Sequence, residues 1–133
     1  MDKDCIFCTF RDERIIGECE YTFTFIDTYP ATPGHTLVVP KRHFASYFDA
    51  TEDELLAIAK AVQKARIILD KEFEPDAYNI GINVGEAAGQ SVHHLHVHIM
   101  PRYKGDVENP RGGVRWILKN KADYSKEKSK NNQ

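Results

Sequence analysis

The sequence SVHHLHVHIMPR, residues 91–102, places four of the six histidines of the chain within six residues. From His94 onward, histidine and large apolar residues alternate, which is typical of a strand with one buried face. Every second residue of a strand lies on the same face, so His94, His96 and His98 are expected to form a row of imidazoles. The intervening apolar residues form the opposite face, which we expect to pack into a core. The predicted strand runs over Val92–Met100.

The flanking segments predict an α+β fold. Thr51 stands three residues before Glu54, the spacing of a capping box, and apolar residues then recur at helical spacing from Leu55 to Leu69. One long amphipathic helix is therefore expected over 51–73, ended by Pro75. Alternating or apolar runs predict further strands at residues 22–26, 35–39 and 77–84. Together these segments predict an antiparallel β-sheet with one long helix packed on a face.

Composition limits the classes of partner. The 133 residues are 41% hydrophobic and 29% charged, as in one globular domain, expected over 1–118, followed by a polar, Lys-rich, mobile tail over 119–133. The net charge of −2 provides no bulk basicity, so we expect neither a nucleic-acid nor a membrane partner. With no apolar run of about 18 residues and an odd number of cysteines, the sequence predicts a cytoplasmic protein.

The histidine row favours phosphate chemistry or a metal. A neutral imidazole nitrogen is a nucleophile, and coupled titration would let a protonated neighbour donate a hydrogen bond to a phosphate oxygen. A His-x-His pair could equally hold a catalytic zinc, and the row alone does not separate these readings. The preceding loop favours a phosphate: Gly85 and Gly89 permit close backbone approach, and Gln90 and Ser91 offer donors.

The segment from Gly89 to Arg102 resembles the histidine triad (HIT) signature, His-x-His-x-His followed by apolar residues. The resemblance extends over about residues 5–103. It includes the Cys5–Cys8 segment, residues 25–27, the stretch PGHTLVVPK at 33–41, and Asn83. It implies the HIT fold and a homodimer in which the two sheets form a continuous ten-strand arrangement.

The same resemblance implies a hydrolase that attacks the α-phosphate of dinucleoside polyphosphates or nucleoside phosphoramidates. His96 would be the nucleophile that forms a nucleotidyl-histidine intermediate, His98 would bind the phosphate, and His94 would complete the triad. The remaining implied contacts are Gln90, Ser91 and Asn83 to the phosphate or leaving group, Asp27 to the ribose, and Phe7 and Phe25 to the base. From the sequence alone, Asp27 is only a turn residue and the two Phe residues fit a core equally well.

Cys5-x-x-Cys8 by itself fits a redox pair, two buried thiols or half of a metal site. The zinc-carrying branch of the HIT family uses two histidines that His43 and His94 resemble. A closed site of Cys5, Cys8, His43 and His94 would hold a structural Zn²⁺. No organic cofactor is expected.

Two other function classes remain open at this stage. One is a zinc-dependent metallohydrolase with His94, His96 and His98 on a single ion, and the other is a nucleotide-binding regulatory module without significant turnover.

Three residues outside the main motifs have more than one interpretation. Arg111 or Arg115 could contact a polyphosphate, or lie in an ordinary surface loop. His35 is interpreted as a strand-start residue that bonds to nearby backbone.

Overall fold

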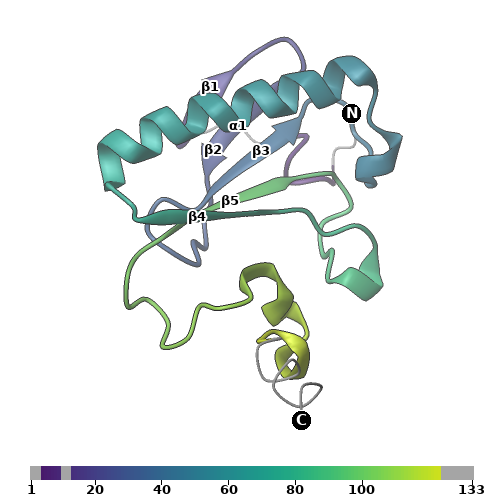
Figure 1. Ribbon diagram of the computed structural model, residues 1–133. Coiled ribbons are helices and arrows are strands. Elements are labelled where there is room, and N and C mark those ends of the chain that lie inside the picture. Colours follow the sequence, from purple (N-terminus) through teal and green to yellow (C-terminus); the bar gives the residue numbers. More distant parts are fainter. Residues whose placement is uncertain (1–3, 10–12, 124–133) are drawn as a thin grey trace. The chain divides into compact units, whose positions relative to one another are not determined.

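The computed structural model describes residues 4–9 and 13–123. Its five strands form one antiparallel sheet in the order β1-β2-β3-β5-β4. The strands are β1 (Ile15–Glu18), β2 (Thr22–Ile26), β3 (Thr36–Pro40), β4 (Ala77–Gly81) and β5 (Val97–Arg102). The chain leaves β3, forms α1 (Glu52–Phe73) and β4, and then returns as β5 between β3 and β4 (Figure 1). The predicted antiparallel sheet with one helix is thus confirmed.

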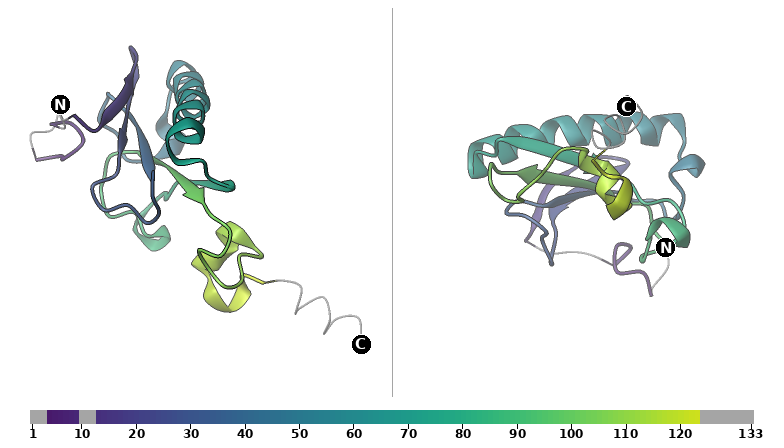
Figure 2. Two further views of the ribbon diagram at one scale, coloured as in Figure 1. Left: turned by 90° about the vertical axis from the view of Figure 1, so that its left-hand side faces the viewer. Right: turned by 60° about the horizontal axis from the view of Figure 1, so that its bottom comes forward.

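Helix α1 begins where the capping box predicts. The Thr51 hydroxyl accepts a hydrogen bond from the Glu54 amide, and the Glu54 carboxylate accepts one from the Thr51 amide. The helix ends at Phe73, and Glu74 follows in a left-handed conformation, one residue before Pro75. In Figure 2 α1 forms a layer of its own beside the strands. Ile58, Ala65 and Leu69 form the buried side of this layer.

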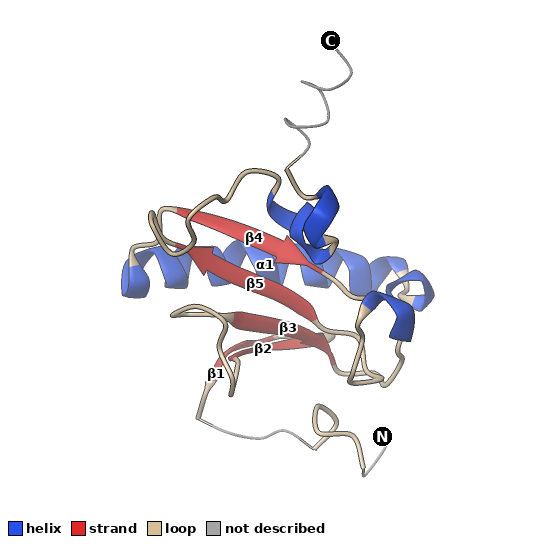
Figure 3. Ribbon diagram, turned by 90° about the horizontal axis from the view of Figure 1, so that it is seen from below, coloured by secondary structure: helices blue, strands red, loops and turns tan. Residues whose placement is uncertain are grey.

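The sheet has a core on each of its faces. On one face, α1 packs over Val38, Leu95, Val97 and Ile99. On the other, the short segment around Cys5–Cys8 packs over Phe23, Phe25, Leu37 and Val39. The apolar residues between the histidines therefore lie under the helix, as predicted. The histidine side of β5 belongs to the face that carries the N-terminal segment, and Figure 3 views the sheet with α1 behind it.

Two predicted strands differ from the structure by three residues or more at one end, and one strand was not predicted. The strand expected over Val92–Met100 is found at Val97–Arg102, because residues 91–96 bond outside the sheet: the Leu95 amide donates to the Phe44 carbonyl. The strand expected over 77–84 ends at Gly81, before the loop that carries Asn83. The strand β1 was not predicted, since its four residues include a glycine and a bulge.

Contacts divide the chain into two units, one ending at Arg102 and the other starting at Tyr103. The predicted boundary at 118/119 lies inside the second unit. There, Gly113–Ile117 and Lys119–Lys121 are short 3-10 helices, and the Arg115 guanidinium donates to the carbonyls of Lys121 and Ala122. Gly112 has φ +97°, and a Cβ there would lie 2.1 Å from the Ala122 oxygen, so the packing requires glycine. The tail predicted over 119–133 lies mostly outside the described residues.

Among the described helices, none combines the length and the apolar character that crossing a membrane would require.

Candidate functional site

His96 is the middle histidine and lies against Phe7. Its residue is 9% exposed, and the ring centroids of His96 and Phe7 are 5.0 Å apart in an edge-on arrangement. The Nδ1 atom of His96 lies 2.9 Å from the backbone carbonyl oxygen of His94. Because a carbonyl only accepts hydrogen bonds, Nδ1 must carry the proton. In the neutral form of this ring the lone pair is therefore on Nε2, which is the arrangement that a nucleophilic imidazole requires.

His98 lies beside His96, with ring centroids 5.0 Å apart. Burial lowers the pKa of His98 to about 4, and the neighbouring His96 and His35 add to this effect while Asp27 opposes it. Burial also lowers the pKa of His94. Both neighbours of His96 are therefore neutral at neutral pH. The sequence had predicted a protonated neighbour as the phosphate donor, and the low dielectric around the rings explains why the neutral form is favoured instead.

His94 turns away from the expected row of three rings. Its Nε2 atom donates to the Pro40 carbonyl oxygen at 2.7 Å, so Nδ1 carries the lone pair. This lone pair is directed at Cys5, Cys8 and His43. The residue is completely buried. Both ring nitrogens of His94 are thus engaged away from His96 and His98, which argues against one metal ion shared by the three histidines of the triad.

Four potential metal ligands converge at the N-terminal segment. The ligand atoms of Cys5, Cys8, His43 and His94 all lie within 4.8 Å of one another. The His94 Nδ1 atom is 3.4 Å from Cys5 Sγ, 3.5 Å from Cys8 Sγ and 3.2 Å from His43 Nδ1, and Cys8 Sγ is 3.2 Å from His43 Nδ1. Around tetrahedral zinc, roughly 3.3 Å would separate two nitrogens and roughly 3.6 Å a nitrogen and a sulfur. The four residues could therefore hold a metal of this kind.

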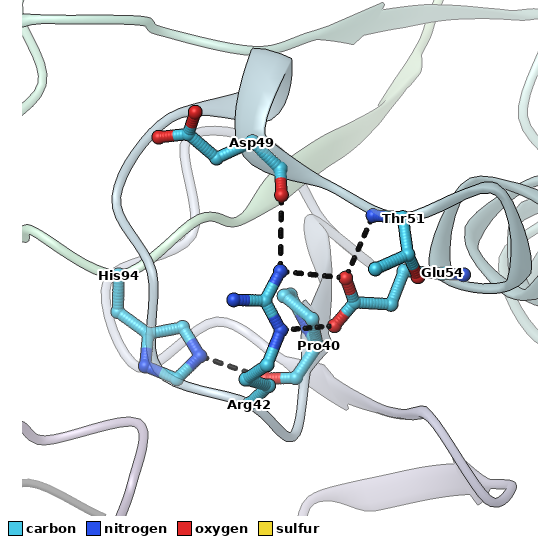
Figure 4. Close-up of polar contacts among 6 residues, drawn as sticks. All are labelled: Pro40, Arg42, Asp49, Thr51, Glu54 and His94. Atoms are coloured by element: carbon cyan, nitrogen blue, oxygen red, sulfur yellow. Dashed lines mark hydrogen bonds and ion pairs between the residues drawn. The ribbon is translucent and has the colours of Figure 1, made fainter.

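The loop that carries His43 is fixed to the start of α1 by Arg42. Its guanidinium donates to both carboxylate oxygens of Glu54, at 3.0 and 2.8 Å, and to the Asp49 carbonyl oxygen at 3.0 Å (Figure 4). The Glu54 side chain is only 5% exposed, and the hydrogen bond from Arg42 lowers its pKa. The same carboxylate closes the capping box, so one buried charge connects the helix N-terminus to the loop between β3 and α1. The sequence analysis recognised the cap but not the pair with Arg42.

The loop before the triad is held by Gln90. Its side-chain oxygen accepts from the Gly85 amide at 2.9 Å, and its side-chain nitrogen donates to the carbonyls of Ala45 and Val92. Gln90 is 5% exposed, whereas Ser91 is exposed. The structure thus assigns the Gln90 amide to loop backbone and leaves Ser91 at the surface beside the histidine segment.

The remaining residues expected to contact the nucleotide differ in burial and in hydrogen-bond partners. The Asp27 carboxylate accepts a hydrogen bond from the Tyr29 amide and lies 3.7 Å from His35 Nδ1. Asn83 is half-buried in the loop after β4. Phe7 contacts His96 directly, but Phe25 is 2% exposed and stacks on Phe23, so the structure favours the core interpretation for Phe25.

His35 reaches the triad, which the sequence analysis did not expect. Its Nδ1 atom accepts a hydrogen bond from the Ala31 amide at 3.0 Å, which confirms the expected backbone contact. Its Nε2 atom also lies 2.9 Å from His98 Nδ1. The strand that follows His35 pairs with the histidine strand, with Leu37 opposite His98, and this pairing was not predicted from the sequence. By contrast, His93 is mostly exposed and lies near Glu86.

Arg111 and Arg115 are engaged within the second unit. The Arg111 guanidinium lies 3.8 Å from the Asp123 carboxylate, and its carbonyl accepts from the Trp116 indole. Arg115 bonds to the backbone of Lys121 and Ala122. These contacts stabilise the local turn.

Comparisons with known proteins identify the family of this chain. The HIT domain family matches residues 10–105. An uncharacterized HIT-like protein of Methanocaldococcus jannaschii is 43% identical over 108 residues, which cover 78% of this chain and 83% of the relative. A bis(5'-nucleosyl)-tetraphosphatase (asymmetrical) of Schizosaccharomyces pombe is 37% identical over 107 residues, 80% of this chain but 59% of that enzyme.

One solved structure is informative for the metal site. The crystal structure of a Zn-bound histidine triad family protein from Mycobacterium smegmatis has a TM-score of 0.72 and 33% identity, covering 80% of each chain. The length of the family match and the identity to these relatives both exceed what chance similarity produces. The chain belongs to the HIT family.

Proposed function

We propose that this protein is a hydrolase of nucleotide conjugates in which His96 attacks the α-phosphate. One observation carries the proposal: the His94 carbonyl holds the proton of His96 on Nδ1 and leaves the Nε2 lone pair for attack. A relative with a tetraphosphatase activity supports the reaction class. The proposed substrates are dinucleoside polyphosphates, with nucleoside phosphoramidates as the second candidate.

The proposed reaction has two displacements at phosphorus. In the first, the His96 Nε2 lone pair forms a P–N bond and the bond from phosphorus to the leaving group breaks. A polyphosphate leaves as an anion, so this step requires no proton donor. In the second, the oxygen of a water molecule forms a P–O bond, the P–N bond breaks and a proton is released to solvent, so the products are a nucleoside monophosphate and neutral His96. His98, Ser91 and Asn83 are proposed to bind the phosphate, and Asp27 the ribose.

We propose that Cys5, Cys8, His43 and His94 bind a structural Zn²⁺. The zinc would fix the N-terminal segment to the sheet, and through it the position of Phe7 against His96. We also propose a homodimer. Strand β4 lies at an edge of the five-stranded sheet and exposes half of Ile80, so pairing of two such edges would give the ten-strand arrangement.

The test is covalent trapping. After an alkaline, denaturing quench during turnover of a diadenosine polyphosphate, which preserves the acid-labile P–N bond, peptide mass spectrometry is expected to find an adenylate on His96. His96→Ala should lower kcat by at least about 1,000-fold while nucleotide affinity changes little. His93→Ala is the matched control, because His93 is exposed and three residues away. An adduct on another residue, or a His96→Ala variant with more than a few per cent of wild-type activity, would reject the proposal, and tight AMP binding without turnover would favour a regulatory module.

A further inference from the structure

A cavity of about 370 Å³ lies between α1 and the hairpin formed by β1 and β2. It is on the α1 face of the sheet, opposite to the face on which Phe7 packs, and at the sheet edge away from β4. Its volume falls within the roughly 300–1,000 Å³ of small-molecule sites. Most of its wall is apolar or small, including Gly17, Leu56, Ala57, Ala61 and Ile68. The proposed reaction and the proposed pairing of β4 edges both leave this cavity unused.

The thiol of Cys19 lies at the mouth of the cavity, in the turn between β1 and β2. Cys19 is exposed, whereas Cys5 and Cys8 are buried. Its Sγ atom is 3.2 Å from the hydroxyl of Thr22, a residue that is 1% exposed. The Cys19 amide also donates to the Thr22 carbonyl oxygen at 2.8 Å. The turn therefore holds the thiol on the side of the hairpin that faces the cavity.

The surroundings of Cys19 favour the thiolate. Burial raises the pKa of this thiol, but the Thr22 hydroxyl, the backbone of Tyr21 and Thr22 and the Lys41 ammonium oppose burial, and the net result is a lowered pKa. The thiolate is the form of cysteine that attacks disulfides. A disulfide that enters the mouth of the cavity would therefore meet a reactive sulfur.

A buried hydroxyl without a partner lines the same cavity. Thr24 is 4% exposed, and it alternates along β2 with Phe23, which packs on the other face of the sheet. Within residues 4–9 and 13–123, no hydrogen bond joins the Thr24 hydroxyl to another group. Buried hydroxyls nearly always have a partner. A ligand with an amide or another polar group would supply one, whereas a purely apolar chain would not.

The charges on the rim favour an anionic ligand. Lys60 and Lys64 of α1 line the cavity, and neither ammonium has an ion-pair partner in the described part of the chain. The acidic residues of the lining are Glu18, which binds Lys41, Asp53, which accepts a hydrogen bond from Tyr21, and Glu20. Two free cations thus face one carboxylate without such a contact, so carboxylates on a ligand would be attracted to α1.

The distances along α1 match a ligand of the size of a tripeptide. The contact between Tyr21 and Asp53 places the turn that carries Cys19 at the start of the helix. Lys60 and Lys64 follow Asp53 by roughly 10 and 16 Å along the helix axis. Three extended residues span at most about 10 Å, and a lysine side chain provides the remaining reach. A short peptide attached to Cys19 could therefore bring its carboxylates to these ammonium groups.

We propose that the cavity binds a low-molecular-weight peptide thiol that carries carboxylates, through a mixed disulfide with Cys19. The Cys19 thiolate attacks one sulfur of the oxidised thiol, a new S–S bond forms, the original S–S bond breaks, and the second half of the disulfide leaves as a thiolate. An amide of the bound peptide pairs with the Thr24 hydroxyl, and its carboxylates pair with Lys60 and Lys64. The site is independent of the proposed hydrolase reaction, because the two lie on opposite faces of the sheet.

The test measures formation of the mixed disulfide on the full chain at neutral pH. The protein is incubated with glutathione disulfide, which is anionic, and separately with 2-hydroxyethyl disulfide, which is neutral. Peptide mass spectrometry identifies the modified cysteine and gives both rates. Relative to the same protein unfolded in urea, we expect the folded chain to favour glutathione disulfide at Cys19 by at least about 5-fold. A folded chain with the preference of the unfolded chain would overturn the proposal.

Two sets of variants separate the cavity from simple exposure of the thiol. Lys60→Gln combined with Lys64→Gln should remove the preference for the anionic disulfide and leave the rate with the neutral one within about two-fold. Ala61→Leu, which fills the cavity, should slow the reaction with glutathione disulfide. Ala59→Leu is the matched control, because Ala59 is exposed and lies outside the lining. An unchanged preference in the lysine variant, or equal rates for the two leucine variants, would place the adduct outside the cavity and reject the proposal.

Thr24→Val tests the predicted contact inside the cavity. The variant keeps the shape of the side chain but removes the hydroxyl, so the equilibrium constant for the mixed disulfide with glutathione should fall about 3- to 10-fold. The urea midpoint of the unmodified protein should not decrease, because the hydroxyl has no partner to lose. A lowered midpoint together with an unchanged equilibrium constant would show that the hydroxyl serves the fold rather than a ligand, and would contradict the proposed contact.

Discussion

His94 and His98 are four residues apart in one segment and share one tautomer, yet their ring nitrogens face different groups. His94 donates from Nε2 to the Pro40 carbonyl and has its lone pair on Nδ1, among the two cysteines and His43. The Ala31 amide donates to His35 Nδ1, so neutral His35 carries its proton on Nε2 and donates it to His98 Nδ1. Neutral His98 therefore carries its own proton on Nε2. Since the residue and its tautomer are the same, the groups that face the two ring nitrogens decide whether the imidazole is suited to bind a metal or to donate a hydrogen bond to a ligand.

The largest expected effect follows from disrupting the proposed zinc site that contains His94. Cys8→Ser removes one of the four proposed zinc ligands, and we expect it to lose stoichiometric zinc and at least about 3 kcal/mol of unfolding free energy. Elemental analysis and urea denaturation measure both quantities. Cys19→Ser is the matched control, because Cys19 is exposed and lies outside the cluster. A zinc-free wild type that is as stable as the zinc-loaded protein would contradict the prediction.

The second effect concerns the His98 side and appears as pH dependence. The pKa of His98 is about 4 in the folded chain, below its value of about 6.5 when unfolded, so between these values the unfolded chain binds more protons. This contribution to stability is fully present above about pH 6.5 and is lost as the pH falls toward 4, by on the order of 2 kcal/mol.

Urea denaturation at several pH values measures the loss for the wild type and for His98→Gln. The difference between the two proteins isolates the contribution of His98 from that of all other titratable groups. We expect the variant to show the smaller loss between pH 6.5 and pH 4. Parallel stability curves for the two proteins would show that His98 is not the group responsible.

The smallest effect is expected from weakening the Arg42–Glu54 pair, which holds the loop next to the proposed metal site but contributes no ligand to it. Glu54→Gln weakens the two charge-assisted hydrogen bonds from Arg42, and we expect it to cost about 1–2 kcal/mol of stability. Because Arg42 precedes the proposed zinc ligand His43, zinc release to a chelator should also become faster. Asp53→Asn, on the same helical turn but exposed, provides the control. Equal rates of zinc release from both variants would show that the Arg42–Glu54 pair does not stabilise the proposed metal site.

The parts of the fold that were predicted correctly depend on local patterns. The capping box at Thr51 and the apolar spacing along α1 are local signals, and they placed the helix start correctly. The alternation of histidine and apolar residues likewise predicted which side of β5 faces α1. Such periodicities reflect burial of one face, which does not depend on the details of tertiary contact.

The orientation of the individual histidine rings could not be predicted from such local patterns. His94 leaves the predicted row because of Pro40, which is 54 positions away, and His98 is oriented by His35, which is 63 positions away. The assignment of Gln90 to loop backbone depends similarly on the Ala45 carbonyl. These contacts form only when distant segments come together, so spacing within one segment does not predict them.

The central claim is that the protons alternate along the histidine segment, which leaves a lone pair on Nε2 of the middle ring. One long-range ¹H–¹⁵N spectrum of the zinc-loaded wild-type protein near neutral pH tests it directly. The account predicts protons on Nε2 of His94, Nδ1 of His96 and Nε2 of His98. A proton on Nε2 of His96 in the free protein would contradict it, because the proposed nucleophile would then have no lone pair for phosphorus.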